Sequence, residues 1–207
     1  MDHTDNAISI EKYRAAAANY DESAQYTMNL RQRTVNLLRL QPGQCVLDVG
    51  AGTGLSYDML LQGVGPAGRV LAFEQSPEMF AHAEQRVAQQ SLSQVWHVCA
   101  AAENVQLPQV ADAVLFNYVH DVSRTPEAIA NIMRQVRPGA RIAMAGMKFF
   151  PWWTGPLNIV AWLKNRPHNA KAADLWSPWD IVQSYCHSWH QESTLMGMSY
   201  IASGIRK

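Results

Sequence analysis

The sequence predicts an α/β fold in which helices cover both faces of a doubly wound, parallel sheet. Apolar runs of strand length alternate with helical patterns from residue 45 onward. The first run also breaks into a turn with glycines at every second position, Gly50, Gly52 and Gly54, before a helix begins. With 48% hydrophobic and 16% charged residues, the composition excludes a disordered chain.

Short apolar runs rich in β-branched residues predict the strands. These runs lie near residues 45–49, 69–73, 95–99, 111–117 and 140–146, and a closing hairpin-like pair follows near 190–196 and 199–205.

Helical periodicity and end signals predict the helices. Two helices fall within residues 8–40, where they cap the expected ligand pocket, and Pro178–Val182 opens the last helix. Another helix begins at Thr125-Pro126-Glu127 and ends at Arg137-Pro138-Gly139. Its apolar face consists of four residues at positions i, i+3, i+4 and i+7, which are Ile129, Ile132, Met133 and Val136.

The length of 207 residues predicts a single domain, with an N-terminal helical cap at 1–40 and a substrate-covering insertion at 147–179. Basic and acidic residues number 17 each, which argues against a nucleic-acid partner. The three cysteines have no metal-ligand spacing, so no metal is predicted. The first residues show no secretion signal, and we expect a cytoplasmic protein with a small-molecule partner.

The glycine turn indicates which ligand binds. A dinucleotide fingerprint has the spacing G-x-G-x-x-G, whereas Leu55 stands at its last position here. Asp48, at the carboxyl end of the first strand, is a poor neighbour for a pyrophosphate. It suits a cation that carries an ammonium and a sulfonium, as S-adenosylmethionine (SAM) does. The alternative is an ordinary strand-turn-helix junction whose glycines only make the turn tight.

An acid also ends the second strand, and this strengthens the ligand interpretation. Glu74 lies 20 residues after Gly54, where a carboxylate accepts hydrogen bonds from both hydroxyls of a ribose. Ser76 and Pro77 then predict a helix start. Met79 on that helix points either toward an adenine or into the helix packing.

Together these motifs resemble the class I SAM-dependent methyltransferases. The resemblance rests on VLDVGAGTG followed by RVLAFEQS, and it extends over residues 10–146. Ala100–Pro108 stands where many relatives carry G-D-A-E-x-L-P, and residues 111–122 resemble the fourth strand and its exit. Tyr13–Asp21 is similar to the Y-x(6)-Y-D helix of ubiquinone- and phospholipid-type members. The resemblance implies a seven-stranded, mostly parallel sheet whose last strand is antiparallel.

The motifs and the resemblance imply a SAM site, with a backbone carbonyl at Asn117 for the methionine ammonium. One departure is that the family's adenine-binding Asp falls at Ala101, so the amide of Ala102 and the side chain of Glu103 are expected to replace it. The expected cofactor-binding residues are Tyr20, Asp48, Gly50, Gly52, Thr53, Gly54, Glu74, Gln75, Met79, Ala102, Glu103 and Asn117.

His120 and Asp121 follow the fourth strand and are the candidate catalytic residues. A histidine has the pKa needed to take a proton from a phenol or an ammonium near neutral pH. The alternative is that His120 is a structural loop residue and that Asp121 caps a turn.

Residues 147–179 carry five of the seven tryptophans. They could form plain core, an apolar lid for an aromatic or lipid-like substrate, or an interfacial patch with weak membrane-surface contact. We expect Tyr118, Trp152 and Trp153 to contact the substrate. The short helix predicted in this segment is too short to span a bilayer.

The sequence thus predicts SAM-dependent methyl transfer to an oxygen or nitrogen of a small apolar or aromatic molecule. Two alternatives stay open: a phospholipid- or quinone-type methyltransferase, and a non-catalytic SAM-binding module. A dehydrogenase is disfavoured by Leu55 and Asp48.

Overall fold

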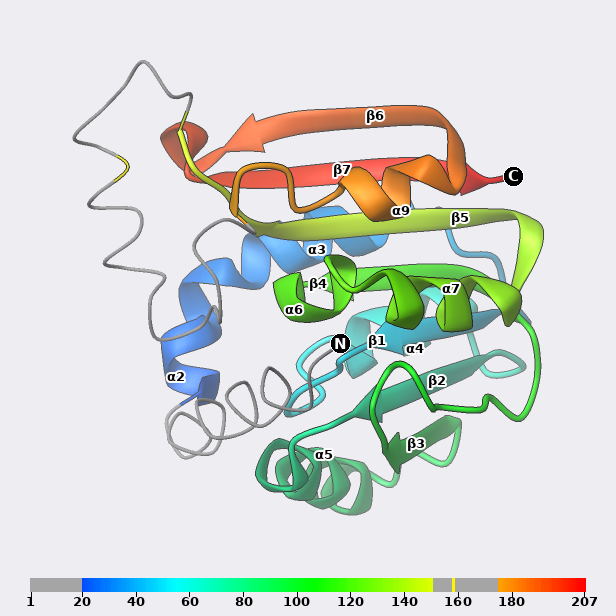
Figure 1. Cartoon of the computed structure of the whole chain (residues 1–207). Helices are drawn as coiled ribbons and strands as arrows, with labels where there is room; N and C mark the ends of the chain where they lie inside the picture. The colour runs from blue at the N-terminus through cyan, green and yellow to red at the C-terminus, as the bar shows by residue number, and fades with distance from the viewer. Residues whose placement is uncertain (1–19, 151–157, 159–174) are drawn as a thin grey trace.

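The computed structural model of the chain describes residues 20–150, residue 158 and residues 175–207. Its strands form one sheet in the order β3-β2-β1-β4-β5-β7-β6 (Figure 1). They are β1 (Cys45–Val49), β2 (Arg69–Glu74), β3 (Val95–Cys99), β4 (Ala111–Asn117), β5 (Val136–Met147), β6 (Cys186–Thr194) and β7 (Ser199–Arg206). Only β7 pairs antiparallel to both neighbours, which confirms the predicted seven-stranded, mostly parallel sheet with an antiparallel last strand.

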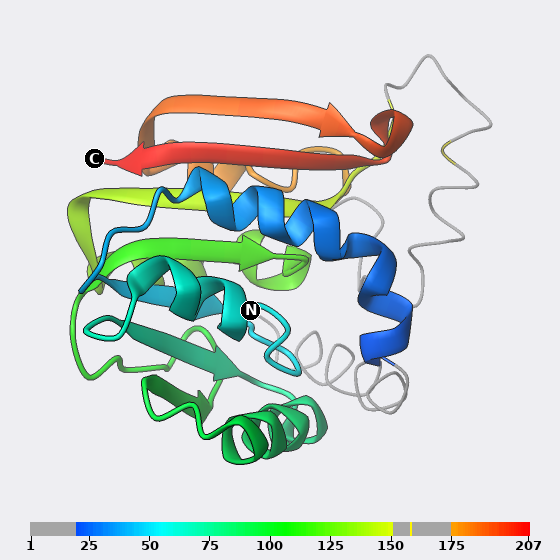
Figure 2. The ribbon, with the colours of Figure 1, turned by 180° about the vertical axis from the view of Figure 1, so that it is seen from behind.

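Helices cover both faces of this sheet, as expected (Figures 1 and 2). One face carries α6 (His120–Ser123), α7 (Pro126–Arg134) and α9 (Asp180–Ser184). The other carries α3 (Met28–Leu37), α4 (Tyr57–Val64) and α5 (Pro77–Gln90). The described part of the N-terminal cap consists of α2 (Tyr20–Ala24), η2 (Gln25–Thr27) and α3, and η5 (Leu195–Gly197) joins the last two strands.

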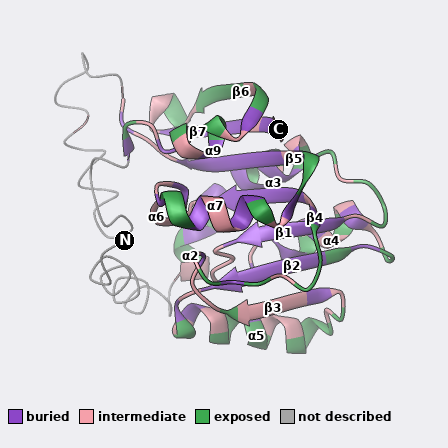
Figure 3. Ribbon diagram, turned by 45° about the vertical axis from the view of Figure 1, so that its right-hand side comes forward, coloured by how far each residue is buried: buried purple, intermediate pink, exposed green. Residues whose placement is uncertain are grey.

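The core lies on both sides of the central strands, because a covered parallel sheet has no solvent face. All five residues of β1 are buried. Its side chains alternate, so that Leu47 and Val49 pack on the side of α7, while Val46 packs on the side of α4. By contrast, β6 lies at the sheet edge and is mostly exposed (Figure 3).

β5 is longer than predicted and corrects one helix boundary. The helix α7 ends at Arg134, and β5 begins at Val136 rather than near residue 140. Val136 pairs with Ala111 of β4, so the expected fourth apolar position of the helix belongs to the sheet instead. The stop signal Arg137-Pro138-Gly139 lies inside the strand, next to a register shift that accommodates it.

The chain first extends the sheet from β1 to one side, through β2 and β3, and then reverses and places β4 on the other side of β1. In open α/β sheets, ligands bind outside the carboxyl ends of the strands at this reversal. Within the described residues, no helix is long and apolar enough to cross a membrane.

Candidate functional site

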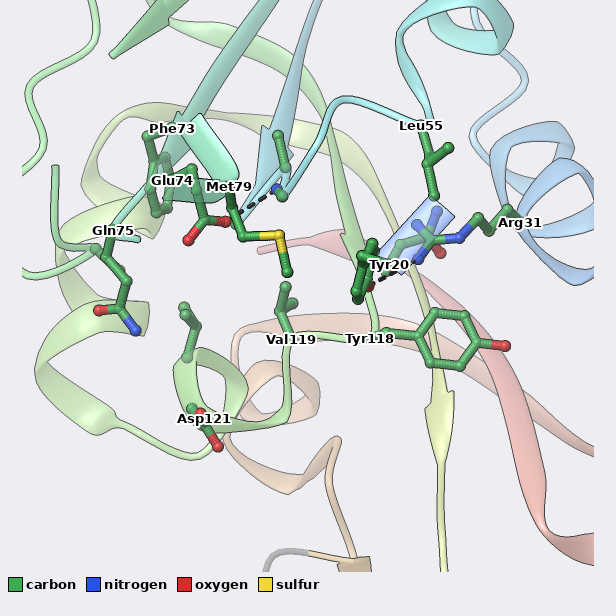
Figure 4. A pocket seen from close by; sticks show the side chains of 16 residues that line it. Tyr20, Arg31, Leu55, Phe73, Glu74, Gln75, Met79, Tyr118, Val119 and Asp121 are labelled. Atoms are coloured by element: carbon green, nitrogen blue, oxygen red, sulfur yellow. Dashed lines mark hydrogen bonds between the residues drawn. The ribbon is translucent and has the colours of Figure 1, made fainter. Parts of the chain in front are cut away.

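A cavity of about 620 Å³, including its open mouth, lies at the carboxyl ends of β1, β2 and β4 (Figure 4). Most of the predicted site residues line it, together with six that the sequence did not indicate. The complete lining is Tyr20, Arg31, Gly50, Ala51, Gly52, Leu55, Phe73, Glu74, Gln75, Met79, Ala102, Asn117, Tyr118, Val119, Asp121 and Val122.

The glycine turn between β1 and α4 forms one wall of the cavity. Gly50 and Gly54 both have positive φ angles, at 56° and 79°. A Cβ atom at Gly50 would lie 2.7 Å from Cγ1 of Val119, and one at Gly54 would lie 2.5 Å from the Tyr57 ring. Glycine is therefore needed at both positions, although Gly54 packs on Tyr57 and does not line the cavity.

Glu74 faces the cavity from the end of β2 with its carboxylate already oriented. Its Oε2 accepts a hydrogen bond from the amide of Gly52 at 2.9 Å, and its Oε1 accepts one from the amide of Ser76 at 2.8 Å. Burial raises the pKa of Glu74, while the amides of Ser76, Gly52 and Gln75 act in the opposite direction. Each oxygen keeps a second acceptor site, which suits a vicinal diol.

Beside Glu74, the cavity is lined by Gln75, Met79 and Ala102. The Ser76 hydroxyl accepts a hydrogen bond from the Met79 amide, which confirms the predicted helix cap and places Met79 in the wall. Glu103 does not line the cavity, and its buried Oε2 has no hydrogen-bond partner within the described residues.

Arg31 of α3 enters the cavity from the opposite end, as Figure 4 shows. It is only 5% exposed. Its Nε donates to Thr27 Oγ1 at 3.2 Å, one terminal nitrogen donates to the hydroxyl of Tyr20 at 3.3 Å, and its guanidinium lies 5.0 Å from the centre of the Tyr118 ring. The guanidinium is thus the cation at this end of the cavity.

Arg31 was not predicted from the sequence, although a signal was present. Arg31 shares a helix face with Thr34, Val35 and Leu38, at i, i+3, i+4 and i+7, and all four are buried. A charged residue on a core-facing stripe marks either a buried ion pair or a ligand contact.

Two buried oxygens lack partners, one on Asn117, which lines the cavity, and one on Asp48, which does not line it. Oδ2 of Asp48 and Oδ1 of Asn117 accept no hydrogen bond within the described residues, while Nδ2 of Asn117 donates to Ser56 at 3.4 Å. Burial raises the pKa of Asp48 to about 7, Arg31 acts to lower it, and Glu74 acts to raise it further. Such unpartnered acceptors are costly unless a ligand donates to them.

These groups fit SAM. Glu74 would hold the ribose, Arg31 would hold the methionine carboxylate, and Asn117 would accept the ammonium, whose charge the buried Asp48 would balance. The same set does not suit a pyrophosphate, because two of its three charged groups are carboxylates.

Thr53 does not line the cavity. Its hydroxyl donates to Oδ1 of Asp21 at 2.5 Å, and its carbonyl accepts a bond from Arg86 at 2.9 Å. Thr53 therefore joins the glycine turn to the cap and to α5.

The two candidate catalytic residues lie in different surroundings. Asp121 lines the cavity, on the other side of Val119 from Tyr118 in Figure 4. The His120 side chain does not line it, because it is buried with Nε2 at 2.8 Å from the carbonyl of Met147. A carbonyl only accepts, so this nitrogen carries the proton. Burial lowers the pKa of His120, whereas the bond to Met147 and the charge of Asp121 act to raise it.

Much of the predicted substrate-covering insertion, including Trp152 and Trp153, lies outside the described residues. Of its described tryptophans, Trp176 packs edge-on against Phe149 with ring centres 5.0 Å apart, and Trp179 packs against Tyr200 at 4.8 Å. Part of the tryptophan-rich stretch therefore contributes to packing at the ends of β5 and β7.

Comparison with known proteins agrees with this geometry. A family model described as a methyltransferase domain matches residues 46–139. The chain is 30% identical to the protein-L-isoaspartate O-methyltransferase of Aeropyrum pernix over 135 residues, which is 65% of this chain and 48% of that protein. It is also 30% identical to the arsenite methyltransferase of Halobacterium salinarum over 114 residues, 51% of this chain and 28% of that protein.

Among solved structures, a SAM-dependent methyltransferase from Aquifex aeolicus matches with a TM-score of 0.70 and 18% identity, over 93% of this chain and 98% of that one. This likeness concerns the fold. The chain spans about half or less of the length of the curated relatives.

Proposed function

Because the chain belongs to the class I, Rossmann-like SAM-dependent methyltransferases, we propose that it transfers a methyl group from SAM to an oxygen or nitrogen of a small apolar or aromatic molecule. The observation that carries the proposal is that Glu74 and Arg31 face one cavity from opposite ends, with an unpartnered acceptor on Asn117 in its wall and another on the buried Asp48, which does not line it.

The chain's residues bind and orient the two reactants. When bound, SAM supplies a methyl group on a sulfonium, ready for in-line attack by a nucleophile. Glu74 holds the ribose hydroxyls, and Arg31 pairs with a carboxylate while Tyr20 and Tyr118 keep its guanidinium in place. The apolar side chains of Leu55 and Val119 exclude water and strengthen these charged contacts.

The acceptor enters beside the exits of β4 and β5 in this proposal. Tyr118 is held there at a φ of 60°, where its amide donates to the carbonyl of Ala145 at 2.8 Å. Non-glycine residues with positive φ concentrate at functional sites. Tyr118, Trp152 and Trp153 are proposed to align the acceptor, and His120 either takes its proton or holds the β4 exit in position.

Two tests address the proposal. Calorimetry should detect SAM binding and no comparable binding of NADH. Mass spectrometry with labelled SAM should then detect a methylated product in a panel of phenols, amines, quinols, lipids, carboxylates and arsenite. Absence of SAM binding would refute the proposal.

The contribution of Arg31 can be separated with a truncated ligand. Methylthioadenosine keeps the nucleoside but lacks the amino-acid part, so wild-type protein should bind SAM more tightly. Arg31→Met should reduce that preference about tenfold, because one charged hydrogen-bonding partner is lost. An unchanged preference would place the carboxylate elsewhere.

A phospholipid or quinone acceptor is the first alternative, motivated by the Tyr13–Asp21 motif. Methylation of only the lipid or quinol members of the panel would favour it. SAM binding without transfer to any acceptor class would favour the non-catalytic module.

A further inference from the structure

Three segments that are distant in sequence meet beside the cavity through Asp21, Thr53 and Arg86. Asp21 belongs to α2 of the cap, Thr53 to the glycine turn and Arg86 to α5. Arg86 donates to Oδ2 of Asp21 at 2.6 Å and, through Nε, to the Thr53 carbonyl at 2.9 Å. The Thr53 hydroxyl donates to the other Asp21 oxygen at 2.5 Å. We call these three residues the clasp.

The clasp differs from an ordinary surface ion pair. Isolated pairs of exposed charges contribute little, because solvent screens them and both side chains lose conformational freedom. Here both Asp21 oxygens are engaged, Thr53 is 2% exposed, and the Arg86 side chain is only 23% exposed. Charge-assisted bonds that share one carboxylate in a partly buried network are stronger and more directional.

The clasp is connected to the cavity through Tyr20, which precedes Asp21 in the chain. Tyr20 lines the cavity, and its hydroxyl accepts the bond from Arg31. On the other side, Thr53 follows Gly52, whose amide donates to Glu74. The clasp thus joins the cap that carries Tyr20 and Arg31 to the turn that orients Glu74.

We propose that Arg86 is a positioning residue, which through the clasp holds the cap over the cofactor cavity and slows cofactor release. This rests on the proposed SAM binding. Arg86 does not line the cavity and acts only through Asp21 and Thr53.

Arg86→Gln, Asp21→Asn and the double variant test the proposal in the full-length chain. Each single variant should raise the dissociation constant for SAM about fivefold to twentyfold, mainly through faster release, since one charged hydrogen-bond partner is lost. The double variant should be no more than about twofold weaker than either single variant, because both changes break the same contact. With saturating SAM, kcat should be unchanged while KM for SAM rises.

Arg33→Gln is the matched control. Arg33 on α3 also pairs with a half-exposed carboxylate, Glu192 of β6, whose exposure of 43% resembles the 47% of Asp21. This pair does not line the cavity. Arg33→Gln should leave SAM affinity and release unchanged. Equal weakening by Arg33→Gln, or wild-type affinity in both clasp variants, would overturn the proposal.

Amide hydrogen exchange over residues 20–30 without ligand separates the clasp from the proposed function. Exchange should rise in Arg86→Gln relative to wild type and to Arg33→Gln. Failure of wild-type protein to bind SAM refutes the proposed function, and unchanged exchange in Arg86→Gln then refutes the clasp as well.

Discussion

The two ends of the cavity differ in how their buried polar groups are satisfied. At the Glu74 end, each carboxylate oxygen already accepts a hydrogen bond from a backbone amide. Toward Arg31, the oxygen Oδ1 of Asn117 in the cavity wall and the oxygen Oδ2 of the buried Asp48, which does not line the cavity, have no hydrogen-bond partner within the described residues. One end is organised before any ligand arrives, and the other still contains unpartnered acceptors.

This difference indicates where binding and stability oppose each other. A ligand at Glu74 adds bonds to a carboxylate whose orientation is already set. A ligand ammonium at Asp48 would instead relieve a buried group that costs the free protein stability. Substitutions at the two ends should therefore differ in their effects on stability even where both weaken SAM binding.

Asp48→Asn should have the largest effect. Losing the buried charge that is proposed to balance the ligand ammonium should weaken SAM binding by about 2–4 kcal/mol. The pKa of Asp48 is raised from 3.8 to about 7 in the folded state, so the folded protein binds this proton more tightly than the unfolded chain. The stabilisation that the protonated Asp48 carboxyl contributes is therefore fully present below pH 4 and is lost as the pH rises through about 7.

At pH 8, Asp48→Asn should therefore raise the unfolding free energy by about 2–4 kcal/mol, and the gain should vanish near pH 4. Denaturant unfolding at both pH values and SAM calorimetry measure the two effects. A variant that loses stability at pH 8 would show that the Asp48 charge is already compensated in the free protein.

Glu74→Ala should weaken SAM binding by about 1.5–3 kcal/mol, the range for a lost hydrogen bond to a charged group. Calorimetry measures the loss, and Glu74→Gln should be milder because it keeps one acceptor oxygen. Stability should not rise as it does for Asp48→Asn, since the amides of Gly52 and Ser76 lose their acceptors. Unchanged affinity would exclude Glu74 as the ribose ligand.

His120→Ala should have the smallest effect, lowering kcat about tenfold with little change in SAM affinity. The expected cause is the lost bond to the Met147 carbonyl, which aligns the exits of β4 and β5. The pH profile of kcat should be the same as in the wild type, because His120 takes no proton from the acceptor in this case. A loss of a limb near the histidine pKa, with a decrease of about 10²–10⁴ in kcat, would support His120 as the general base.

The Glu74 end of the cavity was predictable because its residues are close together in the sequence. Gly50 and Gly52 belong to the turn that follows β1, and Glu74 ends the next strand. Parallel strands bring their carboxyl ends to one edge, so a linear pattern is sufficient to place these groups together. The fold class followed from the same alternation of strands and helices.

The Arg31 end of the cavity and the packing around the site depend on contacts between residues far apart in the chain. Arg31 meets Tyr118 across 87 positions (118 − 31), Arg86 meets Asp21 across 65, and His120 meets Met147 across 27. The start of β5 at Val136 was likewise decided by pairing with Ala111 rather than by helix periodicity. No local pattern encodes such contacts, because they depend on which helix packs on which face of the sheet.

Local backbone chemistry thus already determines the glycine turn, the acid at the end of β2 and the order of elements, since each depends on neighbours in the chain. Tertiary packing alone decides that Arg31 enters the cavity, that His120 turns toward Met147 and that Asp21 joins Arg86. The physical reason is that burial and charge pairing depend on distances in space, which the fold sets only after its layers have assembled.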